Sequence, residues 1–212
     1  MDGHHRPPRQ GEFADPRHAE RPCHHRLPRK GEGVKALILT GTGRVFSAGA
    51  DLDAARAGLA TDPVWERLSR AIADLPALTI AALNGTLAGG AMGMALACDL
   101  RIAVPEARFF YPVMKLGFLP QPSDPPRLTA LIGPARAKLI LMGGQKISAE
   151  DALSFGLIDR ITPLDALLDT ARALAADALA AHPDHVAAIK RMVSAQIPAE
   201  PGEGGFGSDH GR

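Results

Sequence analysis

The chain has 212 residues, 46% hydrophobic and only 4% aromatic, so it can bury one substantial core but is short for two ordinary domains. Its 24 basic residues are balanced by 23 acidic ones, which gives no reason to expect nucleic acid or a membrane surface as the main partner. Cys23 and Cys98 lie far apart, and no apolar run has membrane-spanning or signal-peptide character, so we expect a cytoplasmic protein without a disulfide.

Residues 1–33 differ from the rest of the sequence. They are rich in arginine, histidine and proline and have no hydrophobic periodicity, so they cannot bury enough apolar surface to become ordered. We interpret them as a disordered tail, or as the product of a frameshift or a misassigned start. Cys23-His24-His25 is a weak metal signal without a second cluster of ligands, and we expect no metal site.

From Val34 onward, apolar runs and helix caps alternate. Buried strands are expected at 34–39, 78–83, 101–104, 108–110 and 157–161. Helices are expected at 63–75, at 87–97, after Ser123, after Pro134, from the capping box at Ser148 to Gly156, and at about 164–181 and 184–196. This alternation predicts an α/β fold with buried, largely parallel strands.

Two glycine-rich segments each follow a predicted buried strand: 46–52, which reads FSAGADL, and 84–99, which reads NGTLAGGAMGMALACD. Residues with little or no side chain let a ligand reach backbone N–H groups, and two such donors on one oxygen form an oxyanion hole. The alternative is that the glycines only make tight turns. A dinucleotide site is disfavoured because Phe46 occupies the third glycine position, and neither a Walker lysine nor a G-x-S-x-G elbow is present.

The segments resemble those of the crotonase (enoyl-CoA hydratase/isomerase) superfamily. The similarity continues through Cys98-Asp99, Phe109, Pro112, Gly117, Pro120, Arg127-Leu128, Ile132-Gly133, Gly143, 147–149, 151–152 and 156–157. It implies an α/β fold of the ClpP/crotonase type, a stacked ββα superhelix core with a C-terminal helical layer, here without the strand and helix that open other members. Residues 34–162 would form the acyl-CoA-binding core, 163–197 a helical oligomerisation region, and 198–212 a flexible tail.

The resemblance also implies a site. The backbone N–H groups of Ala50 and Gly90 would hold the thioester oxygen as an oxyanion hole, and Ala48, Asp51, Leu52 and Gly89 would join them in binding substrate. Asp51 and Asp99 could instead be structural residues that cap or fix their loops. No separate cofactor is implied, because coenzyme A enters as part of the substrate.

The chain departs from the family where hydratases carry their two catalytic glutamates, since Gly93 and Val113 stand there. Neither can transfer a proton, so hydration by the two-glutamate mechanism is disfavoured. Tyr111 and Asp124 are tentative replacement acid/base residues, with Asp53 a further candidate. Their structural alternatives are a buried hydroxyl for Tyr111, a helix cap for Asp124 and a solvent-facing side chain for Asp53.

The sequence thus predicts a lyase- or isomerase-type enzyme of fatty acid metabolism that stabilises the enolate of an acyl-CoA. Alternatives are a thioester or C–C bond hydrolase of the same fold, and a catalytically silent acyl-CoA binder or scaffold. The family implies a homotrimer or a dimer of trimers. Acyl chain length is left open.

Overall fold

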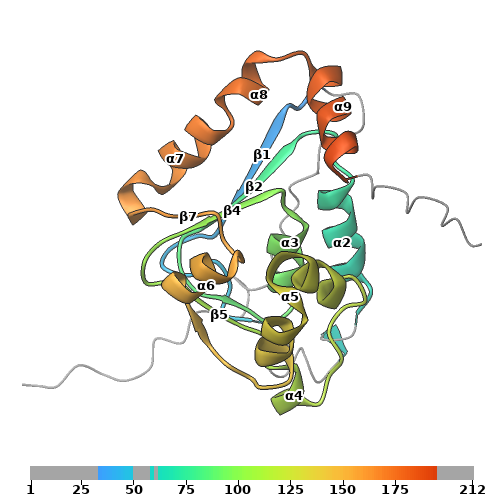
Figure 1. Cartoon of the computed structure of the whole chain (residues 1–212), viewed down its shortest axis with the longest axis vertical. Coiled ribbons are helices and arrows are strands. Elements are labelled where there is room, and N and C mark those ends of the chain that lie inside the picture. The colour runs from blue at the N-terminus through green and yellow to red at the C-terminus, as the bar shows by residue number, and fades with distance from the viewer. Residues whose placement is uncertain (1–32, 50–57, 60–61, 195–212) are drawn as a thin grey trace, which may run out of the picture.

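A four-stranded parallel sheet forms the centre of the protein (Figure 1). The computed structural model describes residues 33–49, 58–59 and 62–194. The strands lie in the order β1, β2, β4, β7, and their bounds are Ala36–Thr40, Leu78–Leu83, Leu100–Ala103 and Arg160–Ile161. Ile80, Leu83 and Ile102 are fully buried, as expected for strands covered on both faces.

A smaller sheet lies next to the first and carries the pocket described below. It contains β3 (Leu87–Ala88), β5 (Arg108–Phe110) and β6 (Ile147–Ser148), with β3 parallel and β6 antiparallel to β5. Ser47 adds an isolated parallel bridge to Leu87. Two sheets with intervening helices agree with the predicted crotonase-like core.

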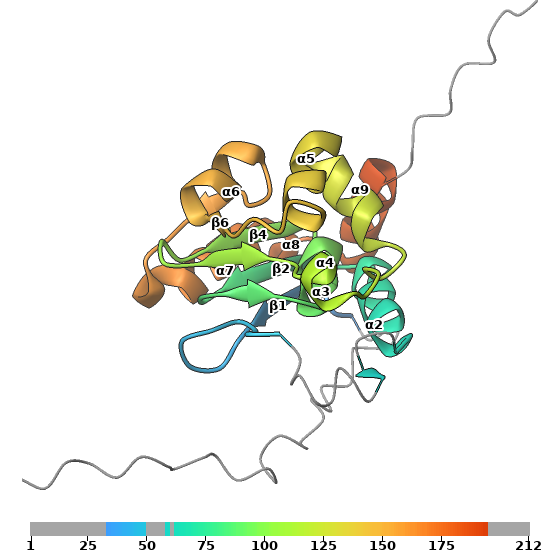
Figure 2. The same cartoon turned by 90° about the horizontal axis from the view of Figure 1, so that it is seen from below.

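Helices cover both sheets, and Figure 2 shows α5 and α6 together on one side of the strands. The helices are α2 (Val64–Ala73), α3 (Ala91–Ala97), α4 (Val113–Leu116), α5 (Asp124–Leu141), α6 (Ala149–Phe155), a 3₁₀ turn (Leu164–Ala166), α7 (Leu167–Leu174), α8 (Ala176–Ala180) and α9 (Pro183–Ser194). In Figure 1, α7 and α8 lie on one side of β1 and β2, and α2 and α9 lie on the other. The predicted C-terminal helical layer is therefore present.

Several element boundaries differ from the sequence prediction. The segment 87–97 is not one helix, because β3 pairs with β5 before α3 begins at Ala91. The last strand is only Arg160–Ile161. The predicted helix break at Gly133 is confirmed, since that residue has φ 77° and ψ 163° within α5. The predicted capping box is also confirmed, because the Asp151 N–H donates to Ser148 Oγ at 3.0 Å.

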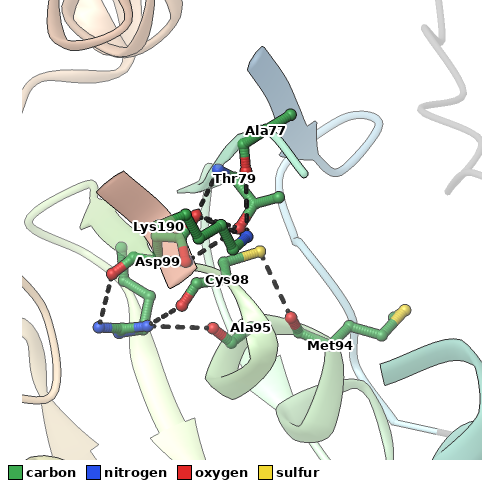
Figure 3. A network of polar contacts seen from close by, with 8 residues as sticks. Ala77, Thr79, Met94, Ala95, Cys98, Asp99 and Lys190 are labelled. Carbon is green, nitrogen blue, oxygen red and sulfur yellow. Dashed lines mark hydrogen bonds and ion pairs between the residues drawn. The ribbon is translucent and has the colours of Figure 1, made fainter. Parts of the chain in front are cut away.

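A polar network fixes α9 to the start of β2 (Figure 3). Lys190 Nζ donates to Ala77 O at 3.0 Å and contacts Asp99 Oδ2 at 2.9 Å. The same carboxylate oxygen accepts hydrogen bonds from the Thr79 N–H and hydroxyl, at 2.8 and 3.0 Å. Asp99 therefore makes structural contacts that join the end of α3 to the sheet and to the C-terminal layer.

Candidate active site

The two glycine-rich segments lie side by side. The N–H groups of Phe46 and Ser47 donate to Thr86 O at 3.1 and 2.9 Å, and Ala88 N–H donates to Ser47 O at 3.0 Å. Gly49 and Gly89 have φ values of 101° and 63°, which residues with a Cβ rarely adopt. The glycines thus allow a backbone-lined surface at the junction of the segments, as the sequence predicted.

Asn84 fastens the loop that precedes the first segment. Its Oδ1 accepts the Gly41 N–H at 3.0 Å, and its Nδ2 donates to Gly43 O and Val45 O at 2.9 and 3.3 Å. Asn84 is only 7% exposed, whereas Gly43 and Val45 are exposed, so the three bonds are partly shielded from solvent. One amide at the end of β2 therefore sets the path of the chain toward the pocket.

We expect Asn84→Ala to lower the free energy of unfolding by about 2–3 kcal/mol, because it removes three partly buried hydrogen bonds to the backbone. Urea denaturation measures the change. Gln145→Ala is the matched control, since its exposed amide makes one 3.4 Å bond to Gly143 O. Equal losses in the two variants would contradict the clamping role of Asn84.

An apolar pocket opens where these segments meet β5 and α4. Its described lining residues are Ala48, Gly49, Trp65, Ala88, Gly89, Gly90, Phe110, Tyr111, Pro112, Val113, Leu116, Phe118 and Leu119. Tyr111 is the one ionisable side chain among them. Gly90, which precedes α3, has a backbone N–H that bonds to no acceptor in the described part of the chain. The apolar pocket wall thus contains one backbone N–H without an acceptor among the described residues and one ionisable side chain.

Tyr111 pairs with a carboxyl group behind the pocket wall. Its hydroxyl donates to Asp124 Oδ2 at 3.0 Å, and Asp124 is only 1% exposed. Burial raises the pKa of Asp124 to about 6, although the Tyr111 hydrogen bond and the Arg127 charge oppose the shift. Burial and the neighbouring carboxylate also raise the pKa of Tyr111 well above its usual range. A tyrosine that stays neutral therefore lies against a carboxyl that titrates near neutrality.

Asp124 does not act as the helix cap that its position suggested. Ser123 is the N-cap of α5, and its hydroxyl donates instead to Glu66 Oε2 of α2 at 2.8 Å, while Asp124 turns inward to Tyr111. The hydrogen bonds from Ser123 hold the pKa of Glu66 below its usual value, although burial acts in the opposite direction. The start of α5 thus contacts the Glu66 carboxylate through Ser123 and contributes the buried Asp124 carboxyl, and the two have pKa values shifted in opposite directions.

The positions of the absent glutamates differ in their surroundings. Val113 lines the pocket at the start of α4. Gly93 is buried in α3, where a Cβ would lie 2.5 Å from Asp124 Oδ1 and 3.2 Å from its Cγ. The Asp124 carboxyl therefore occupies the space that a side chain at position 93 would enter.

The structure brings together some of the predicted site residues. Ala48, Gly89, Gly90 and Tyr111 line one pocket, and Asp124 lies directly behind Tyr111. Ala50, Asp51, Leu52 and Asp53 lie outside the described residues, so their roles stay predictions. Sequence analysis did not single out Trp65 as a pocket residue; its apolar helical spacing gave only a core signal.

Two further properties bear on the kind of site. The described residues contain no group of three or more His, Cys, Asp or Glu side chains arranged to hold a metal ion. Within the same part of the chain, no helix has both the length and the apolarity to cross a bilayer.

Fold and sequence comparisons define the class of protein. The chain resembles DspI of Pseudomonas aeruginosa with a TM-score of 0.70 and 32% identity, over 76% of this chain and 64% of that one. It resembles an enoyl-CoA hydratase of Bacillus anthracis with a TM-score of 0.67 and 34% identity, over 76% and 64% of the two chains. These likenesses confirm the crotonase fold.

The family model described as Enoyl-CoA hydratase/isomerase matches residues 27–206. A carnitinyl-CoA dehydratase of Citrobacter koseri is 38% identical over 176 residues, which cover 80% of this chain and 67% of the relative. The chain belongs to the enoyl-CoA hydratase/isomerase family. It spans about two thirds of the length of the curated relatives it matches.

Proposed function

We propose that the protein binds an acyl-CoA thioester in the apolar pocket and stabilises its enolate with backbone N–H groups. The observation that carries this proposal is the Gly90 N–H, which bonds to none of the described residues and belongs to a pocket wall formed by the two glycine-rich segments. Proton removal next to a thioester carbonyl places negative charge on its oxygen, which a fixed backbone donor offsets. Ala50 would supply the second donor, on the strength of the sequence resemblance.

Ala48, Gly89, Asp51 and Leu52 would bind the substrate around this oxygen. The first two line the pocket, and the other two follow directly along the first glycine-rich segment. No cofactor beyond the coenzyme A of the substrate enters the proposal.

An enzyme of the lyase or isomerase type fits the family better than a hydrolase. None of the described pocket residues is a serine, cysteine or histidine that could attack a thioester. Cys98 is buried beyond the other end of α3, and burial raises the pKa of its thiol to about 12. Because several relatives are carnitinyl-CoA dehydratases, carnitinyl-CoA and other 3-hydroxyacyl-CoA esters are the first substrates to test for loss of water.

Gly90→Pro tests the proposal directly, because proline removes the N–H while its ring fits the observed φ of −59°. We expect solvent deuterium exchange at the α-carbon of bound butanoyl-CoA to fall about 10²–10³-fold, the usual cost of losing one oxyanion donor. NMR of the recovered ester measures exchange, and calorimetry measures binding.

Gly90→Ala is the control, since it keeps the N–H and its Cβ would touch the Trp65 ring at 3.4 Å. Absence of butanoyl-CoA binding by the parent protein would contradict the proposal. Binding without exchange would favour the silent acyl-CoA binder, and release of free thiol would favour the hydrolase.

We also propose that the protein assembles as a homotrimer or a dimer of trimers through 163–197. Met192 and Val193 at the end of α9 are 76% and 81% exposed, which favours their burial by another subunit. Light scattering coupled to size-exclusion chromatography tests this. A monomeric mass at working concentration would overturn it.

A further inference from the structure

Three elements bring a hydroxyl, a carboxyl and an empty backbone position together behind the pocket. Tyr111 lies between β5 and α4, Asp124 begins α5, and Gly93 lies in α3. The Tyr111–Asp124 contact is 3.0 Å, and Asp124 Oδ1 lies where a Cβ of residue 93 would collide with it. The carboxyl can occupy this place only because residue 93 has no side chain.

Asp124 is poorly explained as a purely structural residue. Its Oδ1 is buried and accepts no hydrogen bond from any described residue. A buried polar atom without a partner typically costs about 1–3 kcal/mol, and the cost is greater for a charged group. A carboxyl in this place can lower the cost by binding a proton, which makes Asp124 a candidate proton carrier.

We propose that Tyr111 exchanges a proton with the α-carbon of the bound thioester, and that Asp124, which fills the place left open by Gly93, supplies and recovers that proton. This inference rests on the proposed function. Tyr111 and Gly90 line the same pocket, and the proposal places the thioester oxygen at Gly90 and its neighbouring carbon at Tyr111. Tyr111 is the catalytic residue of the pair, and Asp124 acts through it.

The proton transfer balances without any co-reactant. In the protonated pair, Asp124 Oδ2–H donates to the Tyr111 oxygen and the Tyr111 O–H turns toward the pocket. As the Tyr111 proton bonds to carbon, the Asp124 proton moves to Tyr111, and the enolate electron pair forms the new C–H bond. This leaves a carboxylate that accepts from Tyr111, in keeping with the 3.0 Å contact between the Tyr111 hydroxyl and Asp124 Oδ2. The reverse step removes the α-proton and returns it to Asp124.

The surrounding charges agree with this division of roles. Arg127 lowers the pKa of Asp124 and Glu66 raises it, while burial is the largest effect and leaves the pKa near 6. Tyr111 has its own pKa raised by burial and by Asp124, so its phenolate does not accumulate. The carboxyl, and not the phenol, therefore carries the charge between turnovers.

The test compares α-proton exchange of butanoyl-CoA in Tyr111→Phe and Asp124→Asn with exchange in the parent. We expect both variants to bind the ester within about twofold of the parent and to exchange about 10²–10⁴-fold more slowly, the usual contribution of a general acid or base. Exchange in the parent should follow one ionisation near pH 6, and this ionisation should be absent in Asp124→Asn.

Gly93→Ala provides a second line of evidence, because its Cβ must displace the Asp124 carboxyl and Gly93 is not among the residues that line the pocket. We expect exchange to fall and binding to persist. Asp151→Asn, which removes a carboxylate from the first turn of α6, is the control and should leave exchange unchanged.

Exchange in Tyr111→Phe and Asp124→Asn within about threefold of the parent would overturn the inference and leave the proposed function intact; a rate effect of that size is far below general acid/base catalysis. Failure of the parent to bind butanoyl-CoA would overturn the proposed function and this inference with it. A pH profile that stays the same in Asp124→Asn would show that its role is structural.

Discussion

Replacing Arg101 with methionine is expected to lower the free energy of unfolding by about 3–5 kcal/mol, because it removes a buried charge that several backbone carbonyls share. The guanidinium donates to Cys98 O at 2.6 Å, to Leu157 O at 2.9 Å, and more weakly to Ala95 O and Asp99 O at 3.4 Å. Arg101 is only 4% exposed, and burial lowers its pKa. Methionine fills similar space but leaves the acceptors unpaired.

Removal of the Arg101 guanidinium would also affect the pocket, because α3 connects the two. Arg101 holds the carbonyls at the C-terminal end of this helix, while Gly90 immediately precedes its N-terminal end. We therefore expect Arg101→Met to weaken butanoyl-CoA binding as well as stability.

Urea denaturation measures the stability change, and Arg160→Met on the neighbouring strand β7 is the control. Arg160 is exposed and lies in register with Ile102, so the control removes a charge from the same sheet without orphaning buried carbonyls. A difference of less than about 1 kcal/mol between the two variants would contradict the role assigned to Arg101, since that is the range of ordinary surface substitutions.

The backbone part of the site was predictable from sequence. Positive-φ glycines and small residues after buried strands leave a strong local pattern, and Gly49, Gly89 and Gly90 lie where that pattern placed them. The family resemblance implied that the two segments meet at one oxyanion hole, and the bonds from Phe46 and Ser47 to Thr86 O show that the segments lie side by side.

The proposed acid/base pair could be predicted only residue by residue. Tyr111 and Asp124 were separate candidates, and nothing in their spacing shows that a turn folds one carboxyl onto one hydroxyl. Sequence does not show that Gly93 and Asp124 are neighbours. Only the packing of α3 against α5 reveals that the Asp124 carboxyl occupies the space of a side chain at position 93. Two-residue strands such as β3 and β6 were missed because they are too short to show a period.

The pH dependence of stability should identify Asp124 independently of catalysis. Its pKa rises from 3.8 to about 6 in the folded protein, so the folded state binds more protons than the unfolded state between these values. Stability contributed by the neutral carboxyl is fully present below about pH 4 and is lost as pH rises through about 6. A shift of about 2 pKa units corresponds to about 3 kcal/mol.

Asp124→Asn removes this titration while keeping a group that can bond to Tyr111. We expect the variant to gain up to about 3 kcal/mol relative to the parent between pH 4 and pH 7, with the change centred between the two pKa values. Urea denaturation across this range measures the difference, and Asp177→Asn on the exposed face of α8 controls for the general loss of a carboxylate. A parent–variant difference that stays constant with pH would mean that Asp124 ionises as easily in the folded protein as in the unfolded chain. Tyr111 would then have no buried proton source, and the pocket would retain its backbone donors alone.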